Sequence, residues 1–218
     1  MTGEDRTDSF LRSVAGPEAP VLVKLREENE REGVPLIRKE EEAVLSFFAS
    51  EKKIRQALEI GTGTGYSGIL LLSSLPEAAV LTTVERDPER RKKALRHFEE
   101  AGFLSRVNSI EGAAEDCLSA FPDGSFELIF LDSAKGQYER LFPELLRLLS
   151  PGGVMISDNL FAGGRMLDPR FLVIRRDRTI HENLRRFLDS VLAADELQSM
   201  VVPAGDGLLI SRKKEKDE

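Results

Sequence analysis

The sequence predicts an α/β protein of the doubly wound class, in which helices cover both faces of a mainly parallel sheet. From Gln56 onward, short apolar runs alternate with amphipathic stretches, which indicates strands joined by crossover helices. Before Lys53, apolar residues recur at helical spacing around Gly33-Val34-Pro35, which predicts an N-terminal helical cap. Late in the chain, two apolar runs flank Gly205-Asp206-Gly207, which predicts a C-terminal antiparallel hairpin at the end of the sheet.

The individual elements follow from local signals. Asp87 and Pro88 are typical of a helix start and Gly102 of the helix end. Ser150-Pro151-Gly152-Gly153 predicts a turn between a helix and the next strand. The further expected helices are Tyr138–Leu149 and about Thr179–Leu192, and His97 and His181 are expected on helix surfaces. The expected strands are Ala57–Ile60, Val80–Val84, Val107–Ile110, Leu128–Leu131, Val154–Ile156, Leu197–Val202 and Leu208–Ser211.

Length and composition favour one cytoplasmic domain. The 218 residues, 41% of them hydrophobic, can bury one sizeable core. We expect a single domain over 1–218, with a helical cap (1–52), a core (53–212) and a frayed tail (213–218). Cys117 is the only cysteine, which favours a reducing compartment, and neither a signal peptide nor a membrane-spanning run is evident. The net charge of -7 argues against a protein that coats nucleic acid indiscriminately.

A glycine-rich turn predicts a nucleoside site. The apolar run Leu58–Ile60 leads into Gly61-Thr62-Gly63-Thr64-Gly65 and a following helix. Glycines there let a ligand approach the backbone, and ligands of doubly wound sheets bind at the carboxyl ends of strands. Glu85 ends the next strand, where a carboxylate can accept hydrogen bonds from ribose hydroxyls. Tyr66 stands where a nicotinamide fingerprint needs glycine, which disfavours an oxidoreductase. The alternative is a tight turn beside a solvated Glu85.

Oxygen-bearing side chains follow two later strands. Asp132 comes after one apolar run, and Asp158 and Asn159 come after the next. Because neighbouring strand ends share one rim of the sheet, these oxygens are expected to form a site for a hard divalent cation. Taken singly, each aspartate is better interpreted as a cap of the following helix or loop. Their joint appearance, with Lys135 three residues after Asp132, favours the metal site.

The two motif pairs, Asp132-x-x-Lys135 and Asp158-Asn159, resemble those of the cation-dependent O-methyltransferases that include catechol and caffeoyl-coenzyme A methyltransferases. The resemblance spans about Val34 to Arg212. It implies a Rossmann-like class I methyltransferase fold, S-adenosylmethionine as methyl donor, a divalent cation with Mg²⁺ foremost, and a homodimer. Ala134–Tyr138, Ser157–Asn159 and Pro203–Leu208 look most like the bacterial branch that converts 5-hydroxyuridine at the tRNA wobble position to 5-methoxyuridine.

The resemblance also implies residue roles. Asp132, Asp158 and Asn159 would hold the metal, and Lys135, with Asp132, would be catalytic and assist deprotonation of the acceptor hydroxyl. Two positions depart from the family pattern, because Ser133 replaces a commoner alanine and Ala113 stands where an aspartate often lies near the adenine. The implied cofactor contacts are Ile37, Glu59, Gly61, Ser67, Glu85, Ala113 and Asp132.

The acceptor is predicted from the charge that follows the metal motif. Residues 160–190 contain seven arginines and four acidic residues, a balance of +3. Arginine forks suit phosphate groups, so Arg175, Arg176 and Arg178 are RNA-binding candidates for a tRNA anticodon loop. Three alternatives remain: ordinary surface ion pairs in this segment, a small catechol-like acceptor for the same chemistry, and a nucleoside-binding module without catalysis.

Overall fold

The computed structural model describes Phe10, residues 13–14 and residues 19–215, so most of the polar segment Met1–Arg12 and the end of the tail lie outside it. Among the described helices, none is long and apolar enough to cross a membrane. The main helices are α2 (Pro20–Glu32), α3 (Lys39–Ala49), α4 (Tyr66–Ser74), α5 (Pro88–Glu100), α6 (Ala114–Cys117), α7 (Tyr138–Leu148) and α8 (Arg178–Ala193). The strands are β1 (Gln56–Ile60), β2 (Val80–Glu85), β3 (Val107–Glu111), β4 (Phe126–Leu131), β5 (Leu149–Ser157), β6 (Leu197–Val202) and β7 (Leu208–Lys213).

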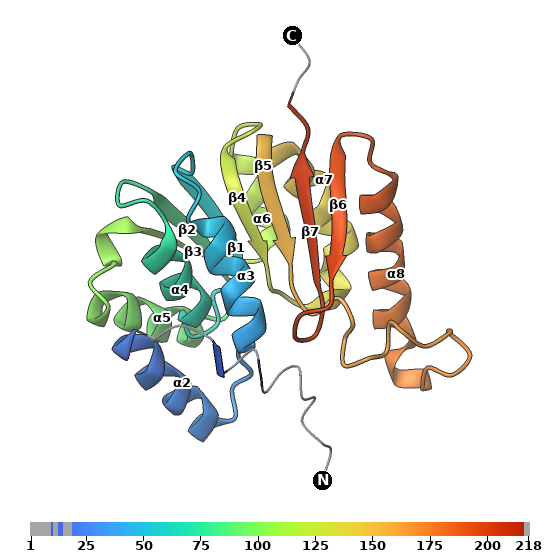
Figure 1. Ribbon diagram of the computed structural model, residues 1–218, viewed down its shortest axis with the longest axis horizontal. Helices are drawn as coiled ribbons and strands as arrows, with labels where there is room; N and C mark the ends of the chain where they lie inside the picture. The colour runs from blue at the N-terminus through green and yellow to red at the C-terminus, as the bar shows by residue number, and fades with distance from the viewer. Residues whose placement is uncertain (1–9, 11–12, 15–18, 216–218) are drawn as a thin grey trace.

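Within the described residues the strands form one seven-stranded sheet in the order β3-β2-β1-β4-β5-β7-β6 (Figure 1). The first five strands, β1 to β5, all run parallel to one another, whereas β7 runs antiparallel to both of its neighbours, β5 and β6. The doubly wound class and the C-terminal hairpin are therefore confirmed. The strand order reverses between β1 and β4, because β2 and β3 lie on one side of β1 and β4 lies on the other. Doubly wound folds bind their ligands at such a switch point.

Two apolar layers separate the sheet from its helices. One layer joins α2, α3, α4 and α5 to one face, through Leu25, Leu45, Ile69 and Phe98 among others. The other joins α6, α7 and α8 to the opposite face, with Leu118, Tyr138, Leu145 and Phe187. Alternate residues along each central strand point to opposite layers, which explains why these strands appear in the sequence as continuous apolar runs.

The N-terminal cap is tied to the glycine turn and to α5. Helix α2 is followed by Gly33, whose left-handed backbone (φ 67°) is typical of the residue after a helix C-terminus. Arg26 and Glu42 both bind the hydroxyl of Tyr66, at 2.7 and 2.8 Å, and Lys93 of α5 forms an ion pair with Glu28 at 2.8 Å. These contacts hold the connection between α2 and α3 beside the carboxyl ends of β1 and β2.

Two local predictions were wrong. The segment Ser150–Gly153 is not a turn before a short strand, because β5 already begins at Leu149, which pairs with Phe126 across an irregular register. His97 and His181 are buried, and each points a ring nitrogen at a backbone carbonyl, of Thr64 (2.7 Å) and Asp168 (3.1 Å) respectively. An imidazole can be buried when its ring nitrogens find such partners, which helical periodicity does not reveal, although Nδ1 of His181 is buried without one.

Candidate active site

The glycine turn is packed directly against the segment that carries Asp132. Gly61 has φ 98°, and a Cβ atom there would lie 2.0 Å from the carbonyl oxygen of Asp132. The backbone N–H of Asp132 in turn donates to the carbonyl of Ile60 at 2.9 Å. Gly65, at φ 89°, precedes the first turn of α4. The glycines therefore permit both the left-handed turn and the close approach of two motifs that are about 70 residues apart.

Gly61→Ala is expected to destabilise the fold by about 3 kcal/mol or more, since overpacking against a backbone atom adds to left-handed strain. Gly63→Ala is the matched control, because Gly63 also has a positive φ (53°) but nothing within 4 Å of an added Cβ. Strain alone should cost the control about 1–2 kcal/mol. Urea unfolding of both variants measures the difference, and equal losses would contradict the close approach.

Glu85 is placed as an acceptor at the end of β2. Its side chain is buried, and its two carboxylate oxygens accept the backbone N–H groups of Gly63 (2.9 Å) and Asp87 (3.0 Å). Each carboxylate oxygen can accept more than one hydrogen bond. The carboxylate is therefore held in a fixed orientation on the cavity wall and can still accept from a ligand hydroxyl.

Glu59, expected to contact the cofactor, lies behind the cavity wall. It is fully buried and accepts hydrogen bonds from the hydroxyls of Ser67 (2.6 Å) and Thr83 (2.7 Å). Burial, aided by the charges of Asp132 and Glu85, raises its pKa to about 7. Among the described residues that line the cavity, Ser67 is present and Glu59 is not, so Glu59 is placed to act through the Ser67 hydroxyl.

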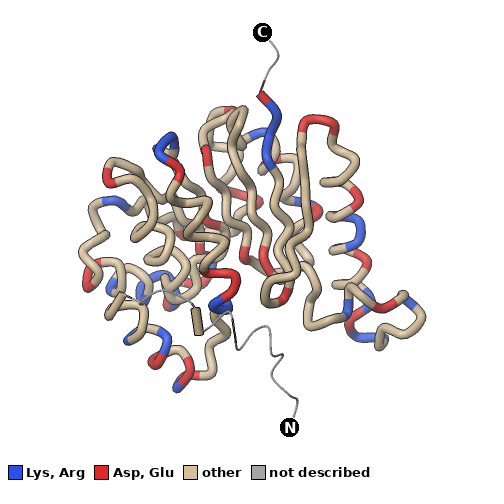
Figure 2. Tube along the Cα trace, viewed as in Figure 1, with Lys and Arg blue, Asp and Glu red and all other residues tan. Residues whose placement is uncertain are grey.

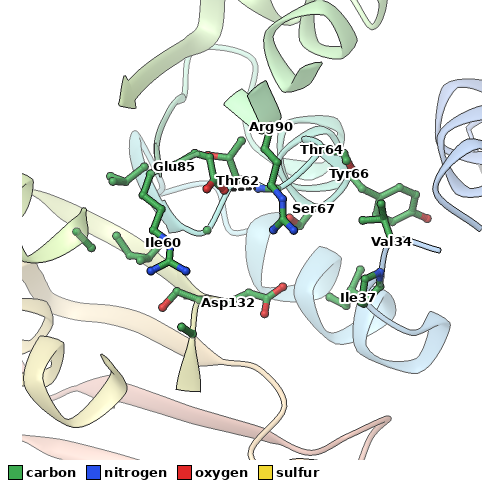
Figure 3. Close-up of a pocket in the computed structure, with 18 of the residues that line it drawn as sticks. Val34, Ile37, Ile60, Thr62, Thr64, Tyr66, Ser67, Glu85, Arg90 and Asp132 are labelled. Atoms are coloured by element: carbon green, nitrogen blue, oxygen red, sulfur yellow. Dashed lines mark hydrogen bonds between the residues drawn. The ribbon is translucent and has the colours of Figure 1, made fainter. Parts of the chain in front are cut away.

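A cavity of about 570 Å³ opens between the glycine turn, the α2–α3 connection and the end of β4 (Figure 3). This volume is in the range of small-molecule and cofactor sites. The side chain of Arg90 also extends into the cavity (Figure 3). This residue was not predicted, because in the sequence it is one of several charges on a helix surface. The expected cofactor residues that line it are Ile37, Gly61, Ser67, Glu85, Ala113 and Asp132.

Beside this cavity, the structure brings two of the three expected metal ligands, Asp132 and Asn159, to one ammonium group. The Nζ atom of Lys135 donates to Oδ1 of Asp132 at 3.3 Å and to the side-chain oxygen of Asn159. Asp158 lies immediately before Asn159, is almost fully buried, and accepts the backbone N–H of Asn159 at 2.5 Å. Asn159 has φ 52°, a left-handed conformation that asparagine tolerates better than most residues.

A third carboxyl group, which the sequence analysis missed, lies against Asp158. Glu41 of α3 is fully buried, accepts the backbone N–H groups of Arg38 and Asp206 at 2.7 Å each, and is hydrogen bonded to Asp158. In the sequence it belongs to a run of three glutamates at a helix start, which reads as a solvated surface. Only the position three residues into the helix, typical of a glutamate that bonds back to the helix start, sets it apart.

The electrostatics of this group suit a cation. Burial and the negative charges of Asp132 and Glu41 raise the pKa of Asp158 to about 8, despite the opposing charge of Lys135. No cluster of three or more His, Cys, Asp or Glu side chains with the geometry of a metal site occurs in the described part of the chain. The set formed here has instead two carboxylates and one amide, all hard oxygen donors of the kind that Mg²⁺ prefers. Its donor chemistry therefore fits the implied metal.

The arginines that follow the metal motif are largely engaged with the protein itself. Arg178 is half-buried and donates to the carbonyl of Val173 at 3.0 Å, so it is poorly placed for RNA. Arg175 and Arg176 are exposed, although Arg176 lies 3.8 Å from Asp177. Figure 2 shows acidic and basic positions interleaved along this region. Further carboxylate pairs are Arg165–Asp177, Arg170–Glu182 and Arg186–Glu139.

A doubly wound sheet with an antiparallel seventh strand, and a cofactor-sized cavity at the glycine turn, define the class of Rossmann-like class I methyltransferases. The chain belongs to the O-methyltransferase family, whose model matches residues 12–214. It is accordingly an enzyme. A putative O-methyltransferase from Mycobacterium sp. (strain JLS) is 35% identical over 173 residues, covering 78% of this chain and 76% of the relative.

Solved structures agree with this membership. The O-methyltransferase TomG from Streptomyces achromogenes, involved in tomaymycin synthesis and solved in complex with SAM, is 26% identical with a TM-score of 0.82, and the match covers 95% of this chain and 96% of TomG. An O-methyltransferase from Bacillus cereus in complex with SAH is 25% identical with a TM-score of 0.83, over 95% and 97% of the two chains. Both relatives share the complete fold.

Proposed function

We propose that this enzyme transfers a methyl group from S-adenosylmethionine to a hydroxyl oxygen that has a second oxygen next to it on the acceptor. The donor would lie in the cavity at the glycine turn, with its ribose hydroxyls at Glu85. A divalent cation, with Mg²⁺ as the first choice, would be held by Asp132, Asp158 and Asn159. The two relatives solved with SAM and SAH support the choice of donor.

One observation carries this proposal: oxygens from two neighbouring strand ends, of Asp132 and Asn159, bind the same cationic atom, Nζ of Lys135. A second oxygen on the acceptor is included because hard cations prefer several oxygen ligands. Asp132 also lines the donor cavity. The acceptor hydroxyl and the methyl group would therefore meet at this residue.

The reaction is a nucleophilic displacement. The hydroxyl proton passes to the Nζ atom of Lys135, which must be a neutral amine in order to accept it. An oxygen lone pair of the acceptor attacks the methyl carbon. The carbon–sulfur bond breaks, and its electron pair stays on sulfur, so that the sulfonium becomes a neutral thioether. A bound cation would stabilise the conjugate base of the hydroxyl. The fixed positions of Lys135 and the glycine turn align oxygen and methyl, and such positioning contributes strongly to rate.

Matched acceptors test this proposal. Catechol and phenol differ only in the neighbouring oxygen. The same is true of an anticodon stem-loop RNA carrying 5-hydroxyuridine and one whose base keeps the 5-hydroxyl but lacks the C4 carbonyl oxygen beside it. Mass spectrometry after incubation with S-adenosylmethionine and Mg²⁺ should detect methylation of the acceptor with two adjacent oxygens and little of its partner. Equal methylation of catechol and phenol would refute the need for a second oxygen.

For the acceptor itself, we propose 5-hydroxyuridine in tRNA. This proposal is supported by the two exposed arginines Arg175 and Arg176, which lie on the segment that follows the metal motif. The ion pairs that other arginines of this segment form with carboxylates favour the small catechol-like acceptor instead. Arg175→Ala with Arg176→Ala should weaken tRNA binding and lower the salt slope by about one unit per lost phosphate contact. Arg212→Ala, which removes an exposed arginine paired with Glu51, is the control. An unchanged salt slope, with efficient turnover of catechol, would favour the small acceptor.

A further inference from the structure

We propose that Tyr138 is a positioning residue for the cation site, whose hydroxyl holds together the two strand ends that carry Asp132, Asp158 and Asn159. This inference rests on the proposed function, because it concerns the same cation. Tyr138 begins α7 and closes the motif that starts at Asp132.

The hydroxyl of Tyr138 connects both strand ends directly. It lies 3.1 Å from the carbonyl oxygen of Leu131 and 3.2 Å from that of Asp158. The first carbonyl belongs to the peptide that leads into Asp132, and the second to the peptide between Asp158 and Asn159. One hydroxyl group therefore fixes the backbone on which all three expected ligands are carried.

The same hydroxyl has no capacity left for a substrate. Its oxygen accepts hydrogen bonds from Nζ of Lys135, at 3.4 Å, and from the backbone N–H of Ser133. A phenol has one hydrogen to donate and two lone pairs, and the two carbonyls share that hydrogen. Tyr138 thus holds Lys135 and the ligand backbone, and does not itself touch the reacting atoms.

The backbone at Asn159, next to the carbonyl group that this hydroxyl binds, has an unfavourable conformation. Asn159 has φ 52°, and residues in this region persist when their surroundings hold them there. The tyrosine ring is itself immobilised, because it is fully buried and packs edge-on against Phe187 with ring centroids 5.3 Å apart. A rigid ring therefore presents the hydroxyl to the strained peptide.

Tyr138→Phe tests the inference by removing one oxygen atom while keeping the ring. The chain contains only two tyrosines and no tryptophan, and the other tyrosine supplies a matched control. The hydroxyl of Tyr66 binds Glu42 and Arg26 beside the glycine turn, so Tyr66→Phe removes the same atom away from the cation. Titration calorimetry with Mg²⁺, and separately with S-adenosylhomocysteine, needs no turnover.

Tyr138→Phe should weaken Mg²⁺ binding by about 10–100-fold, as expected when a group that supports metal ligands is lost. Its affinity for S-adenosylhomocysteine should change little, which also shows that the variant is folded. Tyr66→Phe should bind Mg²⁺ as the wild type does. In Tyr66→Phe the remaining tyrosine emission comes from Tyr138, and saturating Mg²⁺ should alter it.

Equal Mg²⁺ affinity in Tyr138→Phe and wild type would overturn the positioning role and leave the proposed function standing. Failure of the wild-type protein to bind Mg²⁺ at all would overturn both, and the two results are easily told apart. If Tyr138→Phe does not fold, the emission of Tyr66→Phe decides, because a signal unmoved by saturating Mg²⁺ would contradict the role of Tyr138.

Discussion

Asp158→Ala is expected to reduce kcat/KM by about 10³-fold or more, because a bound cation is worth several kcal/mol of transition-state stabilisation. Asp158 is the most deeply buried of the three expected ligands, so no water can easily replace its oxygens. It is not among the described residues that line the donor cavity. Kinetics and S-adenosylhomocysteine calorimetry should therefore show lost turnover with retained donor affinity.

Asp158→Asn is the control for a merely structural effect. Because the pKa of Asp158 is raised to about 8, its stabilising contribution is present at low pH and lost as the pH rises through that value. Without metal, Asp158→Asn should therefore raise the melting temperature relative to wild type at pH 9, with a smaller effect at pH 5. A variant that is inactive and also less stable at pH 9 would indicate misfolding as the cause.

Lys135→Met is expected to lower kcat by roughly 10²–10⁴-fold, the usual contribution of a positioned general base. Methionine has similar length and no proton acceptor of comparable strength. Because the Lys135 ammonium is bonded to Asp132 and Asn159, its loss frees these oxygens, so Mg²⁺ affinity should be maintained or increased. Steady-state kinetics and Mg²⁺ calorimetry on the same preparation separate the two effects.

Lys135→Arg distinguishes proton transfer from charge. Arginine keeps the positive charge but remains protonated in proteins, so this variant should be as impaired as Lys135→Met. Substantial activity in Lys135→Arg would mean that the residue serves as a fixed charge and that the proton goes elsewhere.

The sheet was predictable because its central strands are buried on both faces and therefore appear as continuous apolar runs. The hairpin strand Leu197–Val202 was predicted with the bounds that the structure has. The start of β5 was not, because Ser150-Pro151-Gly152-Gly153 has the composition of a turn, while pairing of Leu149 with Phe126 extends the strand through it. At this point, the pairing of β5 with β4 overrides the preference of the local sequence for a turn.

Part of the candidate site could be predicted from a single rule of topology, which is that the carboxyl ends of neighbouring parallel strands lie at the same edge of the sheet. Strand ends that share a rim bring Asp132 and Asn159 to the same ammonium group. The contact of Glu41 with Asp158 and the contacts of Tyr138 with the two strand ends depend on how α3 and α7 pack, and no spacing in the sequence encodes them. Charge counting likewise could not reveal that Arg170 is paired with Glu182, so it overstated the basic surface.

The requirement for a divalent cation is tested most directly by removing it. The purified enzyme is dialysed against a strong chelator, and methyl transfer from S-adenosylmethionine to its best acceptor is then measured before and after Mg²⁺ is added back. Activity should fall to background and return in a saturable way as Mg²⁺ is restored. Undiminished turnover by the chelated enzyme would contradict the assignment of Asp132, Asp158 and Asn159 as ligands of a catalytic cation.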